Sequence, residues 1–115
     1  MPVGFANNAK TTLASGITNV ATSLTVASGQ GALFPSTAGN VYYYCTLEDV
    51  SKNIEIVKVT ARSSDTFTIV RAQQGTTNRA YSSGSEFSLR LTRDGLTEYV
   101  NDASSAVAVS LAVAL

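Results

Sequence analysis

Three runs rich in β-branched and aromatic residues dominate the middle of the chain and restrict the fold to one built on β-sheet. These runs are residues 54–61, 66–72 and 85–91. The polar residues 62–65 between the first two are typical of a tight turn, which predicts an antiparallel hairpin. In the third run, Phe87, Leu89 and Leu91 alternate with polar residues. This alternation predicts a strand with one buried face, and we expect the three runs to form a meander.

Further strands are expected before this region. Residues 41–48 form another β-type run, and the polar residues 48–53 lead from it into the first of the three runs, which predicts a second hairpin. Residues 23–27 predict a short strand, whereas residues 9–14 alternate too weakly to distinguish an edge strand from a loop. We therefore predict an all-β fold, a small sandwich or partly closed barrel of about six to seven strands, with a C-terminal helical segment.

Two features of the first half bear on the core. The loop 28–40 carries Phe34 between Leu33 and Pro35, and we expect this apolar group to plug against the sheet. Cys45 is the only cysteine, so no disulfide can form within the chain. Because the sequence has no histidine to activate a thiol, we expect Cys45 to be buried and unreactive.

The C-terminal region changes character after the last β-type run. Thr92 is a suitable N-cap and Asp94 places a carboxylate in the first turn, so we expect a helix over residues 93–103. The apolar residues with the 4-3-4 spacing of one helical stripe are Leu96, Val100, Ala103 and Val107. We divide the chain into a β domain, residues 1–92, and a C-terminal oligomerisation segment, residues 93–115.

The end of the sequence carries no charge. From residue 106 onward, large aliphatic side chains alternate with Ala or Ser, a period-two pattern typical of a strand, although Ala and Leu also favour helix. We assign helix to residues 104–115, with strand as the open alternative. The large aliphatic residues are Val107, Val109, Leu111, Val113 and Leu115. Copies of the same tail around a symmetry axis can bury such side chains, so we predict an obligate homo-oligomer with these residues at its contact.

Composition argues against several classes of function. Among 115 residues there is no histidine, which removes most general-base and imidazole-metal schemes, and no phosphate-binding glycine motif occurs. Eight basic residues balance eight acidic ones, so there is no electrostatic case for binding nucleic acid. The N-terminus lacks the features of a signal peptide, and the uncharged run 103–115 is shorter than the ~20 residues that cross a bilayer. We expect a protein folded in the cytoplasm that is not an enzyme, binds no cofactor or metal, and does not associate with membranes.

Candidate contact residues lie on the strand 41–48 and in the loop 73–84. Tyr42 and Tyr44 share the face of their strand opposite Tyr43, and tyrosine is favoured at protein and carbohydrate interfaces. The loop is long for a β connection and rich in small polar residues, so we expect it to be exposed and mobile. We expect its Arg79 and Tyr81 to become ordered against a partner.

The chain also carries a series of short motifs in a characteristic order. They are Phe5-Ala-Asn-Asn8, Thr12-Leu-Ala-Ser-Gly16, Ser23-Leu-Thr-Val-Ala27, Gly31-Ala-Leu-Phe-Pro35, Glu55-Ile-Val-Lys-Val-Thr60, and Thr68-Ile-Val-Arg71 followed by Gly75-Thr76. Over residues 4–98, their order and spacing resemble a small β domain of tailed bacteriophages. That domain occurs in short virion proteins and at the start of tail-fibre-like proteins.

The resemblance implies a function without catalysis. It implies a virion protein that helps to assemble or anchor a tail appendage, as a homotrimer in contact with itself and with other virion proteins. A fibre protein would continue into a shaft, whereas this sequence ends at Leu115, so we expect an anchoring or adaptor subunit. A capsid decoration protein is one alternative. A carbohydrate-binding module that uses Tyr42, Tyr44 and the loop 73–84 is another.

The alternation in two of the strands makes a testable prediction about the core. Phe67 and Ile69 share the apolar face of their run, as Phe87 and Leu89 do of theirs, so all four are expected to face inward. Phe87→Ala should then lower the free energy of unfolding by about 3–5 kcal/mol. Glu86→Ala, on the opposite face, should change it little. Chemical denaturation measures both, and equal stability of the two variants would show that the face is assigned wrongly.

Overall fold

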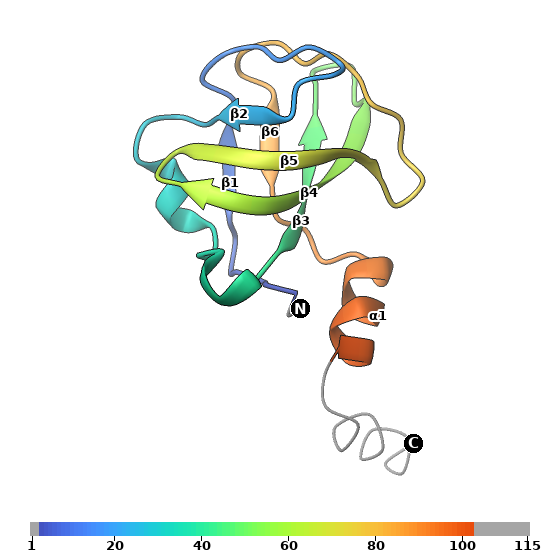
Figure 1. Cartoon of the computed structure of the whole chain (residues 1–115). Coiled ribbons are helices and arrows are strands. Elements are labelled where there is room, and N and C mark those ends of the chain that lie inside the picture. Colours follow the sequence, from blue (N-terminus) through green and yellow to red (C-terminus); the bar gives the residue numbers. More distant parts are fainter. Residues whose placement is uncertain (1–2, 103–115) are drawn as a thin grey trace.

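The computed structural model describes residues 3–102, which form a curled antiparallel sheet followed by one helix (Figure 1). The strands are β1 (Lys10–Thr12), β2 (Ser23–Thr25), β3 (Tyr43–Glu48), β4 (Ile54–Ser63), β5 (Thr66–Gln73) and β6 (Glu86–Ser88). Two 3-10 turns, η1 (Gln30–Leu33) and η2 (Ala38–Asn40), lie between β2 and β3, and α1 spans Arg93–Asp102. The predicted all-β fold with a C-terminal helical segment is confirmed.

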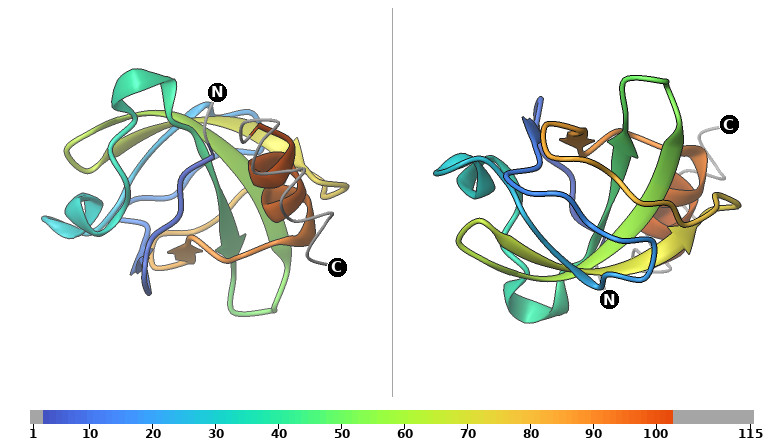
Figure 2. Two further views of the ribbon diagram at one scale, coloured as in Figure 1. Left: turned by 90° about the horizontal axis from the view of Figure 1, so that it is seen from below. Right: turned by 90° about the horizontal axis from the view of Figure 1, so that it is seen from above.

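The sheet curls far enough for its two edge strands to meet. The strand order is β1-β6-β3-β4-β5-β2, so β1 and β2 are the edges. Leu13 and Val26, just beyond these strands, form an antiparallel bridge. The amide of Ala14 donates to the Thr25 carbonyl at 2.9 Å, and the amide of Ala27 donates to the Thr12 carbonyl at 3.0 Å. These bonds join the edges into a partly closed barrel, whose strands surround a common interior in Figure 2.

Both predicted hairpins are present, but the predicted meander is wrong. β4 pairs with β5, and β3 pairs with β4, in antiparallel register. β6, however, pairs with β3 and β1 rather than with β5. The free edge of β5 is taken by β2, so residues 74–85 cross to the opposite side of the barrel and deliver β6 to the free edge of β3. Alternation identifies the buried side of a strand, but it does not identify the strand's neighbour.

The core is an aromatic cluster inside the barrel. Phe67 and Phe87 have ring centroids 5.1 Å apart, and Phe34 lies 5.1 Å from Phe67 and 5.3 Å from Phe87. Phe67, Ile69, Phe87 and Leu89 are all buried, as predicted, but Leu91 is 68% exposed, because β6 already ends at Ser88. The plug expected from the loop before β3 is Phe34 alone, because Leu33 points into solvent.

The C-terminal helix begins where its capping signal predicts. The amide of Gly95 donates to Oγ1 of Thr92 at 3.0 Å, which confirms Thr92 as the N-cap of α1. The helix stands beyond one end of the barrel (Figure 1). Two predictions fall outside the described residues. One is the secondary structure of residues 104–115, helix or strand, and the other is the set of contact residues Val107, Val109, Leu111, Val113 and Leu115.

A close contact at η1 predicts which glycine there is indispensable. The carboxylate of Asp65, in the β4–β5 turn, accepts hydrogen bonds from the backbone amides of Gly29 and Gly31 at 3.0 and 2.9 Å. A Cβ added to Gly31 would overlap the Ser64 carbonyl, whereas the surroundings of Gly29 are open. We expect Gly31→Ala to lower the free energy of unfolding by about 1–3 kcal/mol through this overlap.

Gly29→Asn is the matched control for this prediction. Gly29 has φ of 78°, a left-handed conformation that asparagine tolerates. Thermal denaturation should therefore show a clear loss for Gly31→Ala and a small one for Gly29→Asn. The reverse order would contradict the steric explanation.

Candidate interaction surface

The described residues contain no group of three or more His, Cys, Asp or Glu side chains placed to bind a metal ion. Among residues 3–102, no helix is long and apolar enough to cross a bilayer. Cys45 is fully buried in the barrel, as predicted, and burial raises the pKa of its thiol well above the ordinary value. Three structural features stand out instead. The first is the helix mount, in which Glu98 of α1 binds Tyr42 and Tyr44. The others are the buried ion pair of Glu55 and Arg71 and an apolar strip on α1.

The helix mount joins α1 to the outer face of β3. Alternation along β3 turns Tyr43 into the core and Tyr42 and Tyr44 outward. The Tyr42 hydroxyl donates to Oε1 of Glu98 at 2.9 Å. The Tyr44 hydroxyl lies 2.9 Å from Oε1 and 2.8 Å from Oε2 of the same carboxylate. One glutamate of α1 therefore binds Tyr44 of β3 and Tyr42, the residue just before this strand.

Packing reinforces these hydrogen bonds. The rings of Tyr42 and Tyr44 meet edge to face with centroids 5.9 Å apart, and Nζ of Lys58 lies 4.3 Å from the centroid of Tyr42. Gly95 is buried against Tyr44, because a Cβ there would be 3.7 Å from the ring. Burial and the neighbouring Glu98 carboxylate raise the pKa of Tyr44, so its hydroxyl remains a donor.

The mount corrects the prediction that Tyr42 and Tyr44 form an exposed contact surface. Each side chain is 8% exposed, because α1 covers them. The N-terminal segment contributes as well, since Val3 pairs with Tyr42 and the amide of Gly4 donates to the Tyr42 carbonyl at 2.7 Å. An aromatic residue on the outer face of a strand can be covered by a distant segment of its own chain, and alternation alone does not show that segment.

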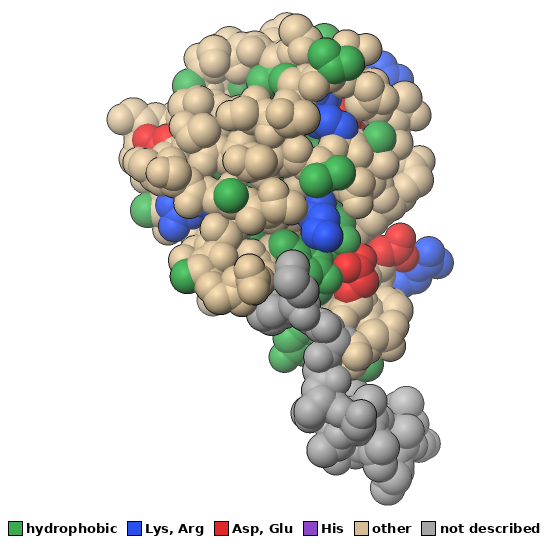
Figure 3. All heavy atoms as spheres, viewed as in Figure 1, with side chains coloured by type: hydrophobic (Ala, Val, Ile, Leu, Met, Phe, Trp, Pro, Cys, Tyr) green, Lys and Arg blue, Asp and Glu red, His purple; other side chains and the backbone are tan. Residues whose placement is uncertain are grey.

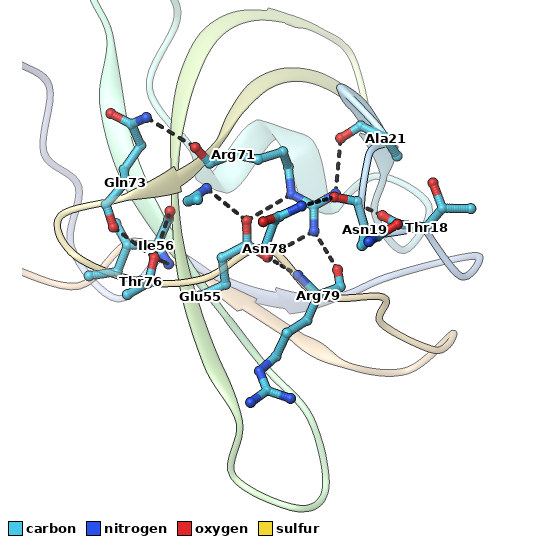
Figure 4. A network of polar contacts seen from close by, with 11 residues as sticks. Thr18, Asn19, Ala21, Glu55, Ile56, Arg71, Gln73, Thr76, Asn78 and Arg79 are labelled. Atoms are coloured by element: carbon cyan, nitrogen blue, oxygen red, sulfur yellow. Dashed lines mark hydrogen bonds and ion pairs between the residues drawn. The ribbon is translucent and has the colours of Figure 1, made fainter.

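The loop between β5 and β6 is exposed over most of its residues, as predicted, but Tyr81 is an exception. Tyr81 is 3% exposed, and its backbone forms a bridge with Ile17. Burial raises the pKa of Tyr81 to about 12. The expectation of an exposed Tyr81 is therefore wrong. Arg79 is exposed, and its guanidinium points away from the neighbouring polar groups in Figure 4, so its contact with a partner stays a prediction.

The buried ion pair holds this loop, and the sequence prediction missed it. Glu55 is fully buried, and its carboxylate accepts hydrogen bonds from Nε and Nη2 of Arg71, each at 2.8 Å. It also accepts the backbone amides of Ala72 and Arg79, each at 2.9 Å (Figure 4). The sequence did contain a sign of it, because Glu55 alternates with Val57 and Val59 on the same, buried face of β4.

Arg71 extends the network to a second loop. Its Nη1 donates to the carbonyls of Thr18 and Ala21 at 2.7 and 3.0 Å, and its Nη2 donates to the carbonyl of Arg79. The loop 13–22 is thereby tied to the loop 74–85, and Asn78 adds a bond to the carbonyl of Asn19 at 2.7 Å. Two loops at the rim of the barrel are thus held in position by one arginine.

An apolar strip runs along the side of α1 that the barrel does not cover. Leu96 and Tyr99 are 46% and 49% exposed, and Phe5, at 39%, meets Tyr99 edge to face with centroids 5.8 Å apart. Val100, one turn after Leu96, is half-buried. We define Phe5, Leu96, Tyr99 and Val100 as the apolar strip. Elsewhere, most of the barrel surface seen in Figure 3 is uncharged and polar.

No protein-family model matches the chain, and no curated protein sequence matches it. Function is therefore inferred from the geometry of the described residues and from the sequence resemblance.

The buried ion pair predicts a strong and pair-specific loss of stability. Glu55→Gln leaves Arg71 without its carboxylate in a site that is nearly closed to solvent, which we expect to cost about 3–5 kcal/mol of unfolding free energy. Arg71→Met alone should cost a similar amount. The double variant should lose much less than the sum, because neither charge is left alone. Denaturant titration of the four proteins tests this, and additive losses would contradict a coupled pair.

The same pair predicts sensitivity to acid. Burial by itself raises the pKa of Glu55, but hydrogen bonds from Arg71 and two backbone amides outweigh it and hold the pKa below its ordinary value. The folded state therefore binds fewer protons than the unfolded state near the ordinary pKa of about 4.3, and stability falls as pH drops from there through the folded-state pKa. Glu55→Gln should show a shallower fall. Part of the slope should remain, because the pKa values of Asp49, Asp65 and Glu86 are also lowered.

Proposed function

We propose that this chain is a structural subunit of a tailed-bacteriophage virion, an anchoring or adaptor component of a tail appendage that assembles as a homo-oligomer. The observation that carries the proposal is the helix mount. Glu98 fixes α1 to Tyr42 and Tyr44, so the chain leaves the barrel at Asp102 in a defined direction. The uncharged residues 103–115 follow directly.

A rigid barrel suits an anchoring role. A subunit that joins an appendage to a particle must transmit its own orientation to the attached segment. The buried pair of Glu55 and Arg71 holds the rim loops, and the bridge between Leu13 and Val26 joins the sheet edges. Together with the helix mount, these contacts tie the rim loops, the sheet edges and α1 to the barrel.

The sequence resemblance supports the phage assignment, and three-fold symmetry comes from that resemblance alone. A capsid decoration protein would use the same rigid barrel and the same apolar tail, so the two structural roles differ in their place on the particle. The carbohydrate-binding alternative loses support, because Tyr42 and Tyr44 are each only 8% exposed, which leaves little ring surface to stack on a sugar.

Assembly through the C-terminal segment can be tested by truncation. We expect the full-length protein to be oligomeric and a chain that ends at Asp102 to be monomeric, because five large aliphatic residues are removed. Multi-angle light scattering measures both, and a single cooperative thermal transition of the truncated chain shows that the dissociated barrel remains folded, although its melting temperature should be lower without association. A full-length monomer, or a truncated chain that keeps the oligomer, would refute assembly through this segment.

Location on the particle is tested separately. Gold labelling of a C-terminally tagged chain on purified virions should mark the tail. Labels spread over the capsid shell would favour the decoration role, and complete absence from virions would refute a structural role of either kind.

A further inference from the structure

The helix docks on the barrel through Gly95 and Glu98 and leaves apolar side chains exposed beside this contact. Gly95 is buried, and Glu98 is bound by two tyrosines on the barrel side. Leu96 and Tyr99 keep nearly half of their surface exposed. An amphipathic helix of a monomeric protein normally turns its apolar side to the core. In α1 a small residue and a carboxylate face the barrel. Leu96 stays 46% exposed, and Tyr99, one turn after Gly95, contacts Phe5 while keeping 49% of its surface exposed.

The helix mount prevents the apolar strip from being buried against the sheet of the same chain. Rolling α1 to bring Leu96 onto the sheet would break the bonds from Tyr42 and Tyr44 to Glu98. It would also move Gly95 away from the ring of Tyr44, beside which it lies. The orientation of the strip is therefore set by specific contacts.

We propose that the apolar strip is the contact surface for a second copy of this chain, with α1 helices packed side by side about a symmetry axis. The inference rests on the proposed homo-oligomer and extends its contact from the tail into the described domain. Leu96 lies three residues from Tyr99 and four from Val100, so these side chains are adjacent on the helix. Phe5 widens the strip through its contact with Tyr99.

Continuity along the chain favours a second copy as the occupant. The spacing of Leu96 and Val100 continues in the sequence at Ala103 and Val107, which lead into the uncharged tail. A tail that associates about an axis brings the preceding helices to the same axis. Because every copy carries the same strip, the strips can cover one another.

Charge is arranged to permit this packing. The carboxylate of Glu98 is held on the barrel side by hydrogen bonds, away from the strip. At the start of the helix, Nη2 of Arg93 pairs with Oδ1 of Asp94 of the same chain at 3.1 Å. Copies of α1 can therefore approach through Leu96 and Tyr99 without burying an unpaired charge at the contact.

Substitution in the strip tests the proposal on the full-length protein. We expect Leu96→Glu to weaken self-association by about 10- to 100-fold, because a charge replaces an apolar side chain at the centre of the contact. Val50→Glu is the matched control, since Val50 is 97% exposed in the β3–β4 turn. Sedimentation velocity over a concentration series measures association, and the melting temperature verifies the fold.

Cross-linking tests the geometry without a change of charge. Cys45 is fully buried, so a cysteine introduced at position 96 is the only accessible thiol among the described residues. A short bismaleimide should link subunits of Leu96→Cys efficiently and those of Val50→Cys poorly. Equal linking of the two variants would overturn the proposal.

The outcomes separate this inference from the proposed function. If truncation at Asp102 dissociates the oligomer while Leu96→Glu leaves association unchanged, the strip is not the contact, and assembly through the tail stands. If the full-length protein is a monomer in which Leu96→Glu lowers the melting temperature, the chain's own tail covers the strip, and both proposals fail. Tenfold or greater weakening by Leu96→Glu, with Val50→Glu unchanged, supports the strip as the contact.

Discussion

The buried ion pair between Glu55 and Arg71 is the interaction on which the rim of the barrel depends. A carboxylate on the inner face of β4 is tolerated only if it is fully bonded, and Arg71 together with two backbone amides supplies those bonds. Nη1 of Arg71, which does not bond the carboxylate, donates hydrogen bonds to the backbone carbonyls of Thr18 and Ala21. One buried charge therefore orders both loops that cover this end of the core, and Tyr81 becomes a core residue as a result.

The second organising feature is the use of both faces of β3. The inner face supplies Tyr43, Cys45 and Leu47 to the core, and the outer face supplies Tyr42 and Tyr44 to the helix mount. Three consecutive tyrosines thus have two distinct tasks on the two sides of one strand. The mount depends on hydrogen bonds more than on apolar burial, which leaves the apolar side of α1 available.

Local patterns in the sequence predicted local structure well. The turn residues 62–65 identified the β4–β5 hairpin, Thr92 identified the start of α1, and the alternation in β5 and β6 identified the buried phenylalanines. The pairing of β6 with β3 could not be predicted, because it depends on β2 occupying the edge of β5. The covering of Tyr42 and Tyr44 likewise depends on Glu98, more than fifty positions away in the chain. The burial of Glu55 is the one long-range feature that the sequence did indicate, because its position in the alternation of β4 places a charge on the same face as buried valines.

The joining of β1 to β2 separates folding from assembly. An open sheet presents unpaired backbone groups to which any extended peptide can add as another strand. Here the amides of Ala14 and Ala27 are already bonded across the seam. The joined edges therefore leave no ready template there for strand exchange or fibrous aggregation when copies of this barrel meet. A contact between copies would then form through side chains, so it could be tuned by substitutions that leave the barrel intact.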